Sequence, residues 1–114
     1  MSELEIGKRT ATTDQLVGYT TVSRLEFVFD PVRSVCDLSL RLENPSNGKA
    51  VALTLNEVAN LKLKEFGGGL TQLLYLVVED VRESQLDRIN FRMRDVERET
   101  FECHYRRLEI SDVL

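Results

Sequence analysis

The sequence has no tryptophan, two cysteines, two prolines and one histidine among its 114 residues. Zinc sites usually need cysteine and histidine ligands paired at short spacings, and Cys36, Cys103 and His104 form no such set. Consecutive strand residues also point to opposite faces, so Cys103 and His104 are poorly placed to bind one ion. We therefore expect two free thiols, no disulfide, no metal and no other cofactor.

Long apolar runs are missing as well. The longest unbroken one, residues 73–78, has six residues and is too short to cross a bilayer. Residues 1–6 are acidic and lack the basic and apolar regions of a secretory signal. These absences predict a cytoplasmic protein with no membrane partner.

Basic residues do not outnumber acidic ones. Fifteen lysines and arginines stand against nineteen acidic residues, for a formal net charge of −4. Nucleic-acid binding without sequence preference depends on basic groups that neutralise phosphates. We therefore expect a protein partner rather than a nucleic acid, and self-association remains open.

Period-two alternation of apolar and polar residues dominates the chain and predicts half-buried strands. The alternating segments are residues 25–29, 36–42, 51–55, 58–63, 89–93 and 101–105. The continuous run 73–78 suggests a central strand covered on both faces. We predict one all-β, or β-rich α+β, domain over residues 1–114, with about seven strands in an antiparallel sheet or sandwich. Residues 1–16 lack clean periodicity and are expected to form a loosely ordered arm.

Three local features refine this prediction. Residues 44–48 combine Asn, Pro and Gly, so the strands on either side should form a hairpin. Asp80 and Glu83 have the spacing of a capping box, which predicts a short helix over residues 81–87. The apolar positions change phase at Arg106 and Arg107, which predicts a β-bulge.

A second hairpin should join residues 88–95 to residues 100–107 across a turn near Glu97. Keeping both apolar sets on one face requires that the numbers of paired residues have an even sum. We predict a sum of 194, because it places Arg92 opposite Glu102. A sum of 196, with Arg94 opposite Glu102, is the competing register.

No catalytic constellation emerges from the remaining polar residues. His104 could act as a general base, but no nucleophile lies at a recognisable spacing, so a surface histidine is the preferred interpretation. The carboxylates of Glu79, Asp80 and residues 97–102 have no fixed separation that would indicate acid–base chemistry. We expect no catalytic residue and no metal ligand.

Two features remain as possible binding sites. The Gly67–Gly69 loop resembles a phosphate-binding loop in composition, but no Lys-Ser/Thr pair follows it, so a structural role is favoured. Arg88, Arg92 and Arg94 share one strand face, which could contact an acidic partner or RNA. Cross-strand pairing with residues such as Glu102 is the preferred interpretation of that face.

The order of elements from residue 24 to residue 110 resembles small all-β immunity-like proteins of bacterial polymorphic toxin systems. An apolar strand at residues 25–29 precedes paired strands that carry Leu40 and Leu53, and residues 58–69 follow. The last segments that share the resemblance are residues 101–105 and 108–110. This resemblance implies a non-enzymatic, cytoplasmic inhibitor that binds one toxin domain, and it transfers no functional residue. The alternative is a small-ligand-binding protein or enzyme with its site near the Gly67–Gly69 loop.

Overall fold

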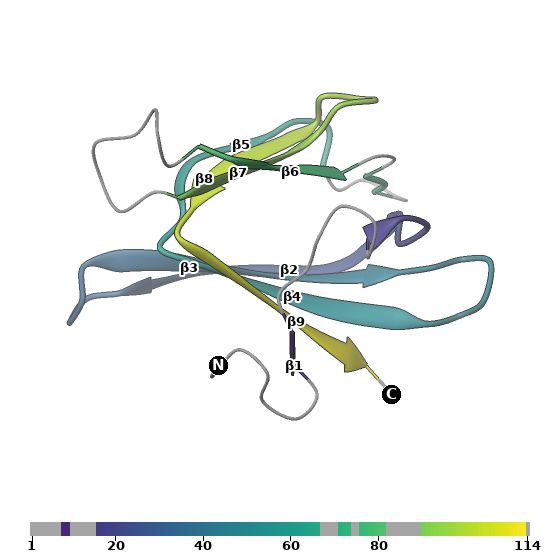
Figure 1. Cartoon of the computed structure of the whole chain (residues 1–114), viewed down its shortest axis with the longest axis horizontal. Helices are drawn as coiled ribbons and strands as arrows, with labels where there is room; N and C mark the ends of the chain where they lie inside the picture. The colour runs from purple at the N-terminus through teal and green to yellow at the C-terminus, as the bar shows by residue number, and fades with distance from the viewer. Residues whose placement is uncertain (1–7, 10–15, 67–70, 74–75, 82–89, 114) are drawn as a thin grey trace.

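The computed structural model describes residues 8–9, 16–66, 71–73, 76–81 and 90–113. Within these residues, nine strands form two antiparallel sheets packed face to face (Figure 1). The five-stranded sheet has the order β1 (Lys8–Arg9), β9 (Arg107–Val113), β4 (Ala50–Asn56), β3 (Val35–Glu43) and β2 (Thr21–Asp30). The four-stranded sheet has the order β5 (Ala59–Leu63), β8 (Phe101–Tyr105), β7 (Phe91–Asp95) and β6 (Leu76–Asp80). The predicted all-β fold is confirmed, with two more strands than expected.

The predicted hairpin around residues 44–48 is present as β3 and β4, with Leu40 opposite Leu53. Its turn is built by side chains that accept main-chain hydrogen bonds: Asn44 Oδ1 from Ser46 N and Asn47 Oδ1 from Lys49 N. Gly48 has a φ of 74°, a conformation that glycine adopts without steric cost. Turn chemistry visible in the sequence therefore sets this hairpin.

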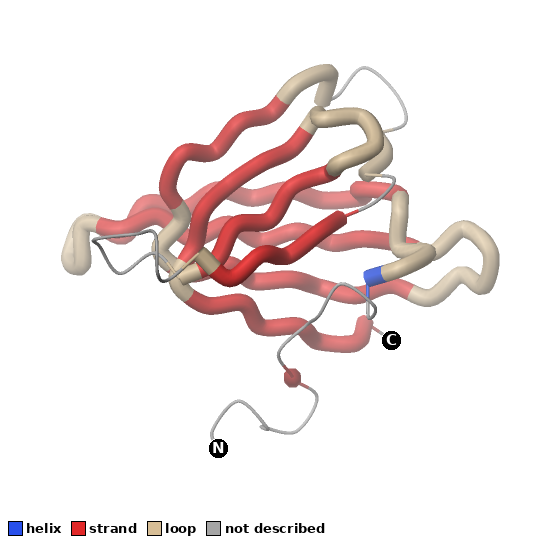
Figure 2. The backbone as a smooth tube through the Cα atoms, turned by 45° about the horizontal axis from the view of Figure 1, so that its top comes forward, coloured by secondary structure: helices blue, strands red, loops and turns tan. Residues whose placement is uncertain are grey.

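The core lies between the two layers, which Figure 2 shows from an oblique direction. Side chains alternate along a strand, so the predicted inner faces of β3, β4 and β8 bury nearly all their apolar residues. The core side chains with at most 1% exposure from these strands are Leu38, Leu40, Leu42, Val51, Leu53, Leu55, Phe101, Cys103 and Tyr105. Phe91 stacks on Tyr105 with ring centroids 5.7 Å apart at the edge of this core.

The phase change at Arg106 and Arg107 is a crossing between sheets, and the predicted bulge is wrong. β8 belongs to the four-stranded sheet, whereas β9 belongs to the five-stranded sheet. Arg106 lies between them, so the side chains on both sides of it can point into the same core. β4 and β5 make the same kind of crossing through Glu57, whose φ is 56°.

The run at residues 73–78 does not form a central strand. Its C-terminal part is β6, which pairs only with β7 and forms an edge of the four-stranded sheet in the described part of the chain. Val77 and Val78 are accordingly only half-buried. Continuous apolar sequence predicts burial on two faces, but it does not specify the order of strands.

Alternation in β2 correctly predicts which side chains share a face but overestimates their burial. Leu25 packs against the core, whereas Phe27 and Phe29 are 48% and 56% exposed. β2 is an edge strand, and the β2–β3 hairpin extends beyond the strands of the four-stranded sheet (Figure 1). Within the described part of the chain, the second layer therefore does not cover the end of this hairpin.

The hairpin of β7 and β8 is confirmed, but the predicted register is wrong by two residues. Arg94 lies opposite Glu102 and Phe91 opposite Tyr105, which is the register with a sum of 196. The turn explains the difference. The main-chain N–H of Glu97 donates to Asp95 Oδ1, that of Glu99 donates to Asp95 O, and Glu99 has a φ of 58°. Asp95 therefore stabilises a longer turn that the sequence did not reveal.

Other expectations fall on residues that the structure leaves undescribed. The helix predicted over residues 81–87 lies outside the described residues except for Val81, and most of the arm at residues 1–16 does too. Lys8 and Arg9 of the arm pair with Ser111 and Ile110 of β9. No helix among the described residues is long and apolar enough to span a membrane.

Shortening a core side chain should destabilise the protein. We expect Leu40→Ala to lower the free energy of unfolding by about 2–5 kcal/mol, because Leu40 is 1% exposed between the sheets. Arg107→Ala, at an exposed side chain on β9, should change it by about 0.5 kcal/mol or less. Urea titrations followed by circular dichroism measure both changes, and equal effects would contradict the assigned core.

The two free thiols should differ in reactivity. Burial, with a smaller contribution from the negative charge of Glu102, raises the pKa of Cys103 to about 12, whereas Cys36 is only half-buried. Thiolate is the reactive form, so iodoacetamide should modify Cys36 well before Cys103 in the native protein. Peptide mass spectrometry over time gives both rates, and denaturant should abolish the difference. Equal native rates would show that Cys103 is not enclosed.

Candidate protein-binding surface

The outer face of the four-stranded sheet carries a concentrated set of charges. We call it the charged face, and it consists of Lys62, Lys64, Glu79, Arg92, Arg94, Glu102 and His104. Cross-strand pairing places Lys62 and Arg94 on either side of Glu102, and Arg92 beside Glu79. Four basic groups face two acidic ones here, although the whole chain is acidic. The face therefore has the opposite charge balance to the chain as a whole.

Glu79 holds two of these arginines in place. Its Oε1 accepts hydrogen bonds from Arg92 Nε at 2.8 Å and Arg94 Nε at 3.2 Å, and Arg92 Nη2 lies 2.8 Å away. Partial burial alone would raise the pKa of Glu79, but the hydrogen bonds from the two arginines lower it below its ordinary value. The arginines that the sequence placed on one face are thus brought together, while Arg88 lies outside the described residues.

A cleft of about 370 Å³ lies at the ends of β5 and β7, beside the β7–β8 turn and the start of β8. Its charged lining comes from Lys62, Lys64, Arg94, Asp95, Glu99 and Glu102. Thr100, which also lines it, is 6% exposed, and its hydroxyl has no hydrogen-bond partner among the described residues. The cleft therefore brings three basic and three acidic groups together in a concave setting, and the basic ones include the exposed Lys62 and Lys64.

His104 occupies the interior of the charged face, as the sequence predicted for an outward position. Its neighbours across the sheet are Ala59 on β5 and Arg92 on β7, and Asn60 Nδ2 lies 3.5 Å from His104 Nδ1. Cys103 points the opposite way and is buried in the core. In the part of the chain that the structure describes, no three His, Cys, Asp or Glu side chains are grouped so as to bind a metal.

A second surface is apolar and lies along the end of β2. We call it the edge patch, and it consists of Phe27, Val28, Phe29 and Val32. Val28 is 49% exposed and Val32, in the β2–β3 turn, is 92% exposed. Val28 faces the opposite side of the sheet from the two phenylalanines, so the patch wraps around the edge of the strand. Contiguous exposed apolar residues of this kind are typical of interaction sites.

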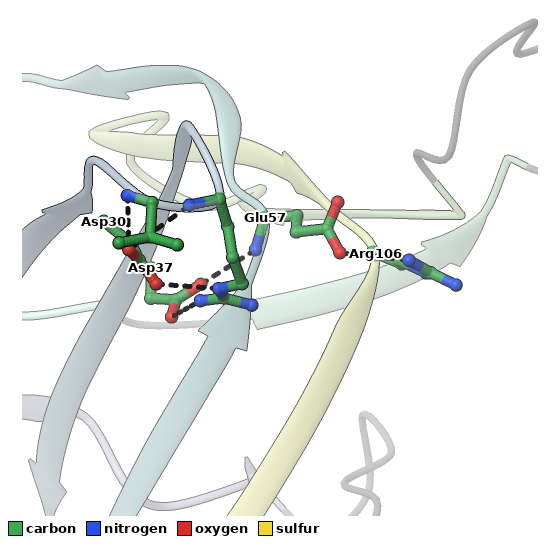
Figure 3. A network of polar contacts seen from close by, with 6 residues as sticks. Asp30, Asp37, Glu57 and Arg106 are labelled. Atoms are coloured by element: carbon green, nitrogen blue, oxygen red, sulfur yellow. Dashed lines mark hydrogen bonds and ion pairs between the residues drawn. The ribbon is translucent and has the colours of Figure 1, made fainter.

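A polar network fixes the turn that carries this patch (Figure 3). Arg33 Nε donates to Asp30 Oδ2 at 2.8 Å, and Arg33 Nη2 donates to Asp37 Oδ2 at 3.1 Å. The main-chain N–H of Glu57 donates to Asp37 Oδ1 at 3.0 Å, and Arg106 Nη1 pairs with Glu57 Oε2 at 3.0 Å. The hydrogen bond from the Arg33 side chain, with those from the amides of Arg33 and Val32, lowers the pKa of Asp30. The turn is thereby joined to the crossings between the sheets.

The sequence predicts part of these surfaces. It places the arginines on one strand face, but it does not predict the cleft, because the cleft depends on how the ends of β5 and β7 meet the β7–β8 turn. The edge patch is not predicted, because the alternation at residues 25–29 indicates a half-buried strand with Phe27 and Phe29 on one face. Its signal was the unbroken Phe27-Val28-Phe29, where an apolar residue occupies the expected polar position. The Gly67–Gly69 loop lies outside the described residues.

The clamp around Glu79 should make stability depend on pH. We expect Glu79→Gln to lower the free energy of unfolding at neutral pH by about 0.2–1 kcal/mol, since the site is partly exposed. A carboxylate whose pKa is lowered on folding stabilises the protein above its unfolded pKa. The difference from the unmodified protein should therefore shrink as pH falls below the ordinary value of 4.5 and through the lowered pKa.

Urea titrations at several pH values test this expectation. Glu99→Gln, at an exposed carboxylate in the β7–β8 turn, is the matched control. An effect of Glu79→Gln that stays constant down to the lowest accessible pH would contradict the clamp.

Comparison with known proteins gives one family match. The model of the family described as immunity protein PIM8 matches residues 12–111, which is most of the chain. Neither a curated protein nor a solved structure shows a significant match. The family match confirms the resemblance to immunity-like proteins and covers both surfaces described above.

Proposed function

Because the chain belongs to the immunity protein PIM8 family, we propose that it binds one toxin domain and blocks its activity without any catalysis of its own. The proposed partner belongs to a polymorphic toxin system, and the proposed site of action is the cytoplasm, where Cys36 and Cys103 stay reduced. Inhibition of this kind requires only a surface that complements the toxin in shape and charge.

The cleft on the charged face is the observation that carries the proposed binding site. An acidic side chain or loop of the toxin enters it and pairs with Lys62 and Lys64, both of which are exposed. Arg94 is already oriented by Glu79, so less conformational entropy is lost when it contacts the toxin.

Electrostatic attraction of this type speeds association and selects the partner. Lysines and arginines on the sheet face attract an acidic region of the toxin, while the negative charge elsewhere on the chain disfavours other orientations. The proposed association rate therefore falls as salt concentration rises.

Growth rescue tests the function. If a gene beside the one for this chain encodes a candidate toxin domain, that domain is expressed in a bacterial host, with and without the chain. We expect growth arrest by the toxin alone and growth when both are present. The purified proteins should also form a complex in size-exclusion chromatography. Continued arrest and the lack of a complex would refute the proposed function for that toxin.

Charge reversal tests the binding site. We expect the double variant Lys62→Glu/Lys64→Glu to weaken toxin binding at least about tenfold, because it replaces two attractive contacts with repulsive ones. Lys49→Glu, on the exposed β3–β4 turn, is the matched control and should bind normally. Biolayer interferometry at several salt concentrations measures both. If the double variant binds as well as Lys49→Glu, the cleft is not the binding site.

A further inference from the structure

The outer edge of β2 is occupied over only part of its length. Thr21 forms an isolated antiparallel bridge with Gln72, Val22 N donates to Thr71 O at 2.9 Å, and Leu73 N donates to Thr20 O at 2.8 Å. From residue 23 to residue 30, β2 pairs only with β3 within the described part of the chain. The edge thus already accepts one extended segment and leaves a longer stretch open.

This open stretch has few of the features that usually protect an edge strand. Natural edges are blunted by charged side chains, especially lysine, and by proline, inward-pointing charge or a bulge. The stretch carries Arg24, Glu26 and Asp30 but no lysine and no proline. Here the bulge lies at the start of the stretch, between Val22 and Arg24, and Pro31 comes only after the strand has ended. The middle of the stretch instead exposes the apolar residues of the edge patch.

We propose that a second copy of this chain pairs with β2 through its own β2, so that the two five-stranded sheets become one continuous antiparallel sheet. The two-fold axis passes through Phe27. A two-fold arrangement needs a surface that complements itself, and four positions for the axis can be compared along the open stretch.

Three of these axis positions are disfavoured. An axis at Leu25 would place the partner's Val28 beside Val22, whose N–H is already donated to Thr71. An axis at Glu26 would set two Glu26 carboxylates directly opposite each other. An axis at Val28 would set Glu26 against the partner's Asp30, which again pairs like charges.

An axis at Phe27 pairs opposite charges and apolar side chains, and it places Glu26 opposite the partner's Val28. It places Phe27 opposite the partner's Phe27, and Leu25 opposite the partner's Phe29, on the face toward the second layer. On the other face, Arg24 lies opposite the partner's Asp30. Arg24 is exposed, and its present contact with Glu26 is long, at 3.8 Å. The pairing uses residues 24–30 and leaves Val32 outside it.

The resulting dimer leaves the charged face open, because that face belongs to the four-stranded sheet, and β2 belongs to the other. Each copy can then bind its own toxin domain. The contact between two strand edges is smaller than a standard interface, so the dimer should dissociate in the micromolar range.

Sedimentation of the purified full chain tests the dimer without any toxin, so its failure is separate from failure of the proposed function. The apparent mass should rise with concentration from 13.1 kDa toward twice that value. Phe27→Lys places two lysines opposite each other and should raise the dissociation constant at least tenfold. Val32→Lys, the same kind of change just outside the pairing, should leave it unchanged.

A charge exchange tests the register. Arg24→Asp and Asp30→Arg should each be monomeric alone. Residue 24 of each copy lies opposite residue 30 of the other, so each variant creates two pairs of like charges in the dimer. Mixing the two variants pairs the introduced aspartate of one copy with the introduced arginine of the other and should restore the dimer. Asp30→Arg also removes the contacts of Asp30 with Arg33, so circular dichroism must first show that this variant folds. If it does not fold, the comparison of Phe27→Lys with Val32→Lys decides the test alone.

Two results would overturn the proposal. One is a chain that stays monomeric throughout the micromolar range, and the other is a dimer equally sensitive to Phe27→Lys and Val32→Lys. If the chain is monomeric and Phe27→Lys also abolishes toxin binding, the open edge is assigned to a strand of the toxin instead.

Discussion

The crossing of two chain segments from one sheet to the other, side by side, is the constraint on which the rest of the structure depends. β4 continues into β5 through Glu57, and β8 continues into β9 through Arg106. Arg106 N donates to Asn56 O at 2.9 Å, and Val58 N donates to Cys36 O at 2.8 Å. The ion pair of Arg106 with Glu57 connects the two crossings directly. Because both connections are short, the sheets are held face to face at this corner, and the core fills the space between them.

The same corner determines what is exposed. Asp37 joins Glu57 to Arg33 and so ties the β2–β3 turn to the crossings. That hairpin extends beyond the four-stranded sheet, so its apolar side chains gain no second layer. An apolar group that remains in water loses the stabilisation that burial would give. Retaining Phe27 and Phe29 there is physically reasonable if another chain covers them.

The two surfaces of the molecule have different physical characters and separate locations. The charged face combines oriented arginines, exposed lysines and a cleft, which suits rapid recognition of an oppositely charged protein. The open edge of β2 offers main-chain hydrogen bonds and apolar side chains, which suit strand addition. Membership of an immunity protein family supports the proposed role of the charged face in toxin binding. The self-complementary order of residues 24–30 supports the proposed role of the open edge in dimer formation. The two roles use different surfaces, so they do not compete.

Local structure and the facing of side chains follow from the amino-acid sequence alone. Strict alternation in residues 36–42 and 51–55, with a turn rich in Asn and Gly, was sufficient for the β3–β4 hairpin, because period and turn chemistry are both local properties. Three features became apparent only from the packing of the strands: the phase change at Arg106 is a crossing, β6 lies at an edge of the described sheet, and Asp95 lengthens the β7–β8 turn. The cleft and the open edge of β2 also depend on how the strands pack. Strand order and the extent of the second layer depend on contacts between residues far apart in the chain, and a local pattern carries no information about them.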